Sequence, residues 1–166
     1  MKLDQRGITL LETIIAMGIM SFAMVLFYIL YVTGAQSVAK GEKRFSVQQN
    51  TRYVAGVITR EVRHATSVGT STPPSTVYYT IRRDTSSNCL IIDTYDNGGT
   101  TSRVVGKYID DLSFSKVDIS GKPGLSFTVY GNDGSYDSDY DITSQLLLMN
   151  IRSLSSFTGD TIYYTK

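Results

Sequence analysis

The residues best placed to do chemistry stand near the start of the chain, where one carboxylate, Glu12, interrupts an apolar segment. An acidic side chain in the hydrocarbon core of a membrane costs on the order of 3 kcal/mol by insertion scales, so it is retained where a partner neutralises it. The apolar segment runs from Ile8 to Val32. As a helix it would span about 38 Å, enough to cross a bilayer core of about 30 Å. The sequence therefore predicts a membrane-spanning helix whose acid must be paired.

A second group of carboxylates lies in the distal part of the chain and could hold Ca²⁺ through oxygen ligands. Its members are Asp133, Asp137, Asp139 and Asp141. In an EF-hand register that starts at Asp137, however, Ile142 occupies the position where the sharp turn needs glycine, and no glutamate closes the loop. A polar loop and a solvated strand with Tyr136 and Tyr140 at alternate positions is the preferred interpretation, and a calcium site is the alternative.

Three other features could in principle act chemically, but each is better explained by a structural role. Cys89 is the only cysteine, which excludes an intramolecular disulfide, and the Leu90-Ile91-Ile92 run beside it indicates a buried strand position. His64 is the only histidine and has no neighbouring ligand or base, so a surface or helix-end position is expected. Asp110-Asp111 is expected in a turn. No phosphate loop, dinucleotide fingerprint, nucleophile elbow or zinc spacing occurs, so we expect no enzyme, cofactor or metal.

Charge is distributed unevenly along the 166 residues. Residues 1–66 carry eight Lys and Arg against four Asp and Glu, a net charge of +4, whereas residues 67–166 carry eight against eleven, a net charge of −3. Arg82, Arg83 and Arg103 in the distal part could touch DNA, together with its tyrosines. The negative balance there is nevertheless a poor match for nucleic acid, which is not expected as the main partner.

The apolar segment is flanked by signals for its orientation and continuation. Lys2 and Arg6 precede it and place the N-terminus in the cytoplasm by the positive-inside rule, although Lys40, Lys43 and Arg44 weaken that preference. Beyond it, an apolar stripe recurs at helical spacing, which predicts that the helix continues to about Ala65 with one face buried by a sheet. The stripe consists of Val54, Val57, Ile58, Val62 and Ala65.

The leader resembles that of a known superfamily. A basic leader ending in Arg6-Gly7, followed by Ile8, Thr9-Leu10-Leu11-Glu12 and a long apolar helix, is similar to the class III leader of type IV pilins and pseudopilins. The resemblance implies that a membrane-embedded prepilin peptidase cuts after Gly7 and that the new N-terminus, Ile8, is methylated. It also implies that Glu12 pairs with that N-terminal amine in the filament. Ile8 stands where the family usually has phenylalanine.

A weaker resemblance concerns the second half of the helix. Residues 52–65 resemble the corresponding stretch of minor pilins similar to the J-type pseudopilin and the W-type minor pilin; an ordinary amphipathic helix is the alternative. The expected parts are a leader at 1–7, a transmembrane and filament-core helix at 8–32, an amphipathic continuation at 33–66 and a β-rich head at 67–166.

The head is expected to be built from short strands rich in β-branched and aromatic residues. After a loop at Thr66–Thr76, runs at 77–81, 88–95, 101–105, 112–117, 125–130 and 145–151 have strand length, and a last edge strand is expected around 162–164. Asp96-Asn97-Gly98-Gly99 predicts a hairpin turn. The fold class is therefore α+β, pilin-like, with a long N-terminal helix packed on an antiparallel β-sheet head.

The expected function is that of a structural subunit. It would be held in the cytoplasmic membrane as a single pass, N-in and C-out, before joining an extracellular or periplasmic filament. The resemblance implies other pilins, prepilin peptidase and the assembly platform as partners. A minor pilin or pseudopilin that initiates or caps a pilus or secretion pseudopilus is favoured over a major subunit. The alternative is a tip pilin for adhesion or DNA uptake, and an enzyme on an uncleaved anchor is the weakest option.

Overall fold

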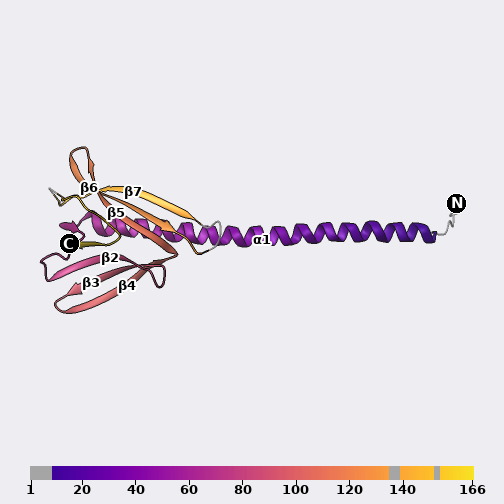
Figure 1. Cartoon of the computed structure of the whole chain (residues 1–166), viewed down its shortest axis with the longest axis horizontal. Coiled ribbons are helices and arrows are strands. Elements are labelled where there is room, and N and C mark those ends of the chain that lie inside the picture. Colours follow the sequence, from indigo (N-terminus) through magenta and orange to yellow (C-terminus); the bar gives the residue numbers. More distant parts are fainter. Residues whose placement is uncertain (1–8, 135–138, 152–153) are drawn as a thin grey trace, which may run out of the picture. The chain divides into compact units, whose positions relative to one another are not determined.

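The computed structural model describes residues 9–134, 139–151 and 154–166. The chain divides into two compact units, Met1–Gly41 and Glu42–Lys166. One helix, α1 (Leu10–Arg63, 54 residues), belongs to both units (Figure 1). It continues without interruption through Gly18, Gly34, Gly41 and Gly56, and it ends two residues before the end expected from the sequence.

The part of α1 that belongs to the second unit is amphipathic, as its sequence predicts. Ala65, two residues beyond the end of α1, is completely buried. Val54, Ile58 and Val62 of the helix itself are completely buried as well, and Val57 is nearly so. Residues three and four apart lie on the same face of a helix, so these side chains form one continuous apolar stripe. This stripe is one wall of the core of the second unit, and the other walls are β-strands.

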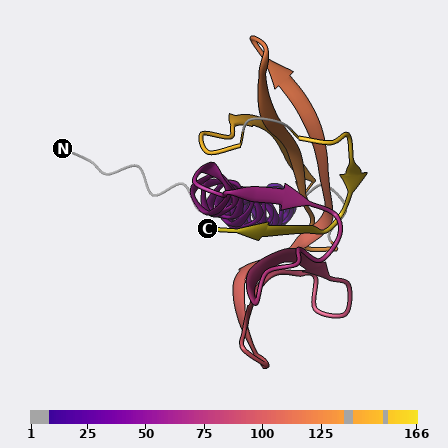
Figure 2. The ribbon, with the colours of Figure 1, turned by 90° about the vertical axis from the view of Figure 1, so that its left-hand side faces the viewer.

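Beyond α1, the described residues of the second unit form strands, arranged in two antiparallel sheets, and the segments that connect them. One sheet has the order β1-β9-β2-β3-β4 and the other has the order β7-β6-β5-β8. Figure 2 shows the strands gathered around the last turns of α1. The strands are β1 (Ser67–Gly69), β2 (Val77–Asp84), β3 (Cys89–Asp96), β4 (Gly99–Lys107), β5 (Ile109–Ile119), β6 (Lys122–Gly131), β7 (Tyr140–Leu147), β8 (Thr158–Gly159) and β9 (Ile162–Thr165). The α+β class predicted from the sequence is confirmed.

Both sheets contribute to the same core. Phe114 of β5 and Phe127 of β6 are register partners whose ring centroids lie 6.4 Å apart, and both are buried. Ile81 of β2 and Tyr164 of β9 reach the same cluster from the first sheet. The predicted hairpin between β3 and β4 is present, with Asn97 and Gly98 at positive φ. Burial of both sheets against one helical stripe explains how about a hundred residues without a disulfide form a core.

Several details of the predicted strands are wrong. β9 is not an edge strand, because it pairs with β1 on one side and with β2 on the other. The short β1 lies in the segment predicted as a loop. Its sequence begins with serine and ends with glycine, which are typical of loops, so it gives no strand signal. β7 covers 140–147 rather than 145–151, since the polar alternation of its first half carries no apolar signal. Asp110 and Asp111 lie in β5, not in a turn, at a register shift opposite β6.

Candidate functional site

The N-terminus of α1 is capped by Thr9. The amide of Glu12 donates to Thr9 Oγ1 over 3.3 Å, and the amide of Thr13 donates to the carbonyl of Thr9 over 3.2 Å. Threonine followed three residues later by glutamate is the sequence signature of a capping box. The interpretation of the sequence assigned no role to Thr9, although this signature was present. Thr9 therefore fixes where the helix begins and holds Glu12 in its first turn.

The side chain of Glu12 is exposed. Within the described part of the chain its carboxylate takes part in no hydrogen bond and no ion pair, and it does not return the bond to Thr9 that would complete the capping box. The positive end of the helix dipole favours a negative charge at this place. Gly7 and Ile8, the expected cleavage and methylation residues, lie outside the described residues.

Other polar groups on this part of the helix are satisfied internally. The hydroxyl groups of Thr13, Ser21, Thr33 and Ser37 each donate to the carbonyl oxygen four residues earlier, over 2.8–3.1 Å. Such bonds remove the penalty for placing a hydroxyl group in an apolar medium. Glu12 therefore differs from the serine and threonine side chains of the same helix, because its charge still needs a partner.

The first unit presents an apolar surface that nothing in the described structure covers. Leu10, Phe27 and Tyr31 are 81%, 72% and 76% exposed, and the most apolar window of α1 has none of its residues buried. Exposed apolar surface of this extent marks contact with a membrane or with other proteins. By length and composition, α1 is long and apolar enough to cross a membrane.

The comparison with protein families bears directly on this end of the chain. A model of the prokaryotic N-terminal methylation motif matches residues 2–28. The match supports a class III prepilin leader, a prepilin-like pilin or pseudopilin, and, together with the apolar helix, a membrane-anchored pilin. It implies processing by prepilin peptidase and assembly with other pilins, and it suggests a structural subunit rather than an enzyme. No curated protein and no solved structure matches the chain.

Cys89 and His64 occupy the kinds of position that the sequence predicts. Cys89 begins β3, is buried and unpaired, and its thiol lies 3.2 Å from the carbonyl oxygen of Ser87. His64 follows the last residue of α1 and is exposed. A calcium site was the alternative interpretation of the distal carboxylates, and no group of three or more potential metal ligands occurs among the described residues. Asp137, one of those carboxylates, lies outside the described residues.

The arginines that could have contacted DNA each meet a carboxylate. Arg82 Nε lies 2.7 Å from Asp93, Arg83 lies 3.3 Å from Asp110, and Arg103 lies 3.4 Å from Glu61. Asp93 is nearly completely buried and also accepts from the hydroxyl of Ser102 over 2.6 Å. The hydrogen bond to Asp93 raises the pKa of Arg82 above its ordinary value. These pairs leave fewer free cations on the first sheet than the sequence suggests.

A polar cluster that the sequence did not reveal joins α1 to β9. Glu61 accepts from Lys166 over 2.6 Å and from the hydroxyl of the buried Tyr164 over 3.1 Å. Burial by itself raises the pKa of Glu61, but the bonds and charges of Lys166, Tyr164 and Arg103 outweigh it and hold the pKa below its ordinary value. Burial, followed by the charge of Glu61, raises the pKa of Tyr164. Arg103 lies 42 positions from Glu61 in the sequence, and Tyr164 and Lys166 lie 103 and 105 positions from it, so no local pattern indicates these partners.

Proposed function

We propose that this chain is a minor pilin or pseudopilin, a structural subunit that is cleaved after Gly7, methylated on Ile8 and assembled through α1. The observation that carries the proposal is the first unit of the chain. It combines a capped helix start, an apolar surface with no cover, internally satisfied hydroxyl groups and one unpaired carboxylate. An element of this kind is stable where lipid or neighbouring helices cover it and where a cation meets Glu12.

Cleavage after Gly7 would create the cation that Glu12 needs. The new amine on Ile8 would be four positions from Glu12 in the sequence, and the amine of one subunit and the carboxylate of the next would neutralise each other in an apolar bundle. Without cleavage, the amine would stand seven residues further from Glu12. Processing and assembly would in this way be linked by one ion pair.

The proposed location follows from the same residues. Lys2 and Arg6 favour a cytoplasmic N-terminus, so the head would lie outside the cytoplasmic membrane before it joins an extracellular or periplasmic filament. The leader at 1–7, the span at 8–32, the continuation at 33–66 and the head at 67–166 would then have separate roles. The partners would be other pilins or pseudopilins, prepilin peptidase and the assembly platform protein.

Two features favour a minor subunit that initiates or caps the filament. One is the resemblance of residues 52–65 to J-type and W-type subunits, and the other is the large head with its long connecting segments. A tip subunit whose head binds DNA or a surface is the alternative from the sequence. Pull-down with the full chain separates the two, because an initiating subunit retains sibling pilins whereas a tip binder retains DNA or surface material.

The mature N-terminus provides the direct test. Mass spectrometry of the chain from cells that contain prepilin peptidase should give a protein that begins at methylated Ile8, and cells without the peptidase should give the full leader. The Gly7→Ala variant should keep the leader in both. An intact Met1 in the presence of the peptidase overturns the proposal.

A further inference from the structure

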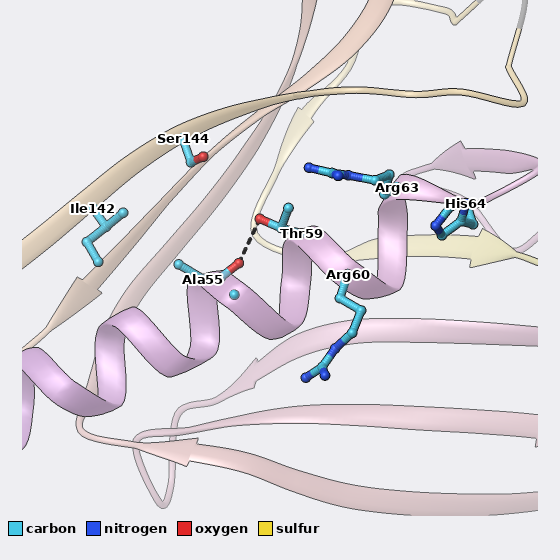
Figure 3. Close-up of a pocket in the computed structure, with 8 residues that line it drawn as sticks. Ala55, Thr59, Arg60, Arg63, His64, Ile142 and Ser144 are labelled. Atoms are coloured by element: carbon cyan, nitrogen blue, oxygen red, sulfur yellow. Dashed lines mark hydrogen bonds between the residues drawn. The ribbon is translucent and has the colours of Figure 1, made fainter.

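A groove in the second unit lies between the last turns of α1 and the strand β7. Its volume is about 490 Å³, within the range of ordinary ligand sites. The helix contributes Ala55, Thr59 and Arg63, and β7 contributes Ile142 and Ser144 (Figure 3). The groove thus combines apolar side chains, those of Ala55 and Ile142, with polar and basic ones.

Basic side chains stand along the helical side of this groove. Arg60, Arg63 and His64 all line it, and none of them forms a hydrogen bond or ion pair within the described part of the chain. In Figure 3 the Arg63 side chain extends back along the helix toward Thr59, whereas Arg60 leaves the helix on the side away from Ile142 and Ser144. Arg63 is therefore the cation best placed for a ligand in the groove.

Capping of the helix C-terminus does not account for these basic side chains. The carbonyl of Arg63 already accepts from the amide of Met149 over 3.4 Å, and the carbonyl of His64 accepts from the side-chain amide of Asn150 over 3.0 Å. Basic side chains near a helix C-terminus often bond to its free carbonyl groups. Here Met149 and Asn150 donate to these carbonyl groups instead, so the guanidinium donors of Arg63 remain available to a ligand.

The other side of the groove is the edge of a sheet. β7 pairs with β6 on one side, and no described strand pairs with its second side. Alternate backbone amide and carbonyl groups of an edge strand are available to an added strand. The hydroxyl of Ser144 likewise has no hydrogen-bond partner in the described structure.

We propose that this groove binds an extended, acidic segment of another polypeptide, added as a strand along β7 with a carboxylate on Arg63. Strand addition supplies main-chain hydrogen bonds, and the flanking pockets select the side chains. The unpaired cations select an acidic segment over a neutral or basic one, and a guanidinium can bind a carboxylate through two parallel bonds. The proposal goes beyond the pilin function and does not depend on it.

Fluorescence anisotropy on the full chain in a non-ionic detergent tests the proposal. The probe is a labelled eight-residue peptide of alternating aspartate and valine. We expect it to bind at least ten-fold more tightly than the same peptide with asparagine in place of aspartate, and more tightly still than a lysine and valine peptide. An aspartate peptide with N-methylated backbone amides should bind at least ten-fold more weakly, because it cannot add as a strand.

Matched variants locate the site. Arg63→Glu should weaken binding at least ten-fold, and Arg60→Glu should weaken it less, because Arg60 points away from β7. Lys107→Glu, an equal charge reversal at an exposed position of β4, should leave binding unchanged. Gly56 also lines the groove, and a Cβ there meets nothing within 4 Å. Gly56→Leu should therefore block binding without loss of thermal stability, while Gly56→Ala should leave binding intact.

Each of four results overturns the proposal. These are equal binding of the aspartate and asparagine peptides, equal loss in Arg63→Glu and Lys107→Glu, undiminished binding in Gly56→Leu, and undiminished binding of the N-methylated peptide. Displacement of the peptide by equimolar inorganic phosphate also counts against it, since that result indicates a simple anion site. Failure of these tests leaves the pilin proposal standing, because the mature N-terminus is measured independently.

Discussion

The carboxylate of Glu61 on α1 lies 2.6 Å from the ammonium group of Lys166, which directly follows β9. The same carboxylate accepts from Tyr164, the largest completely buried side chain of the head, and faces Arg103 of β4. One partly buried acid thus joins the helix to an interior strand, β9, and to an edge strand, β4, of the first sheet. Charge-assisted bonds of this kind are stronger than bonds between neutral groups.

Removal of the Glu61 charge should destabilise the head. Glu61→Gln keeps the size of the side chain but leaves Lys166 and Arg103 without their acid, and it weakens the bond from Tyr164. We expect a loss of about 1–2 kcal/mol in the free energy of unfolding, measured on the full chain in detergent by near-ultraviolet circular dichroism of the tyrosines. Glu42→Gln, at an exposed position of the same helix, should change it by less than about 0.5 kcal/mol.

The same cluster should make stability depend on pH. The folded pKa of Glu61 lies below its ordinary value of 4.5, so the folded state binds this proton more weakly than the unfolded state. The stabilisation is therefore present above pH 4.5 and is lost as the pH falls through the folded pKa. The melting temperatures of the native chain and of Glu61→Gln should converge on acidification from neutral pH. A constant difference between them down to the acid limit would contradict the assignment.

The close approach of β6 to α1 requires glycine at position 131. A Cβ there would collide with Thr51 Oγ1 and lie 3.0 Å from Val47 Cγ1, both on buried residues of the helix. Overpacking of this kind costs about 1–3 kcal/mol, so Gly131→Ala should lower the thermal midpoint clearly. Gly69→Ala in β1 is the control, since its Cβ meets nothing within 4 Å and its φ is not positive. Equal stability of the two variants would show that the helix and strand can separate at little cost.

The elements of this fold were predictable to different degrees, for physical reasons. The long helix and its buried stripe follow from a regular apolar spacing, which is a local signal. The central strands follow from runs such as Leu90-Ile91-Ile92 and from the hairpin turn at Asn97-Gly98. The sequence did not predict β1, and it misplaced β7, because β1 is short and the first half of β7 is polar. Pairing with β9 and β6, respectively, holds these segments as strands.

The candidate sites divide in the same way. Glu12 was evident, because a charge in an apolar run is visible in the sequence itself. The Glu61 cluster and the groove beside β7 were not, since each unites residues that lie about eighty to a hundred positions apart. Thr9 is an intermediate case. Its threonine-to-glutamate spacing is a recognised capping signal. However, Glu12 was explained by the cost of a charge in a membrane, and the capping role of Thr9 was not predicted.

Thr80 provides a test of an unsatisfied polar group. Its hydroxyl is buried in β2 and has no hydrogen-bond partner among the described residues. Thr80→Val removes that group at nearly constant volume, so the head should become equally or more stable, by up to about 1 kcal/mol. Thr51→Val is the matched contrast, because the buried Thr51 hydroxyl donates to the carbonyl of Val47 over 2.8 Å. Thr51→Val should therefore lower the thermal midpoint whereas Thr80→Val should leave it unchanged or raise it, and a comparable loss in both variants would reveal a partner for Thr80.

Glu12 tests the proposed link between processing and assembly. The amide of Glu12 donates to Thr9, and this cap depends on the backbone, so Glu12→Gln should preserve the helix start. We expect full cleavage after Gly7 in this variant and normal insertion in the membrane, but at least ten-fold less protein in the sheared filament fraction, because no carboxylate meets the amine of Ile8. Gly7→Ala should instead fail at cleavage. The two variants separate the steps: if Glu12→Gln enters filaments at the native level, the proposed ion pair is not required, and if it remains uncleaved, Glu12 acts earlier, at the peptidase.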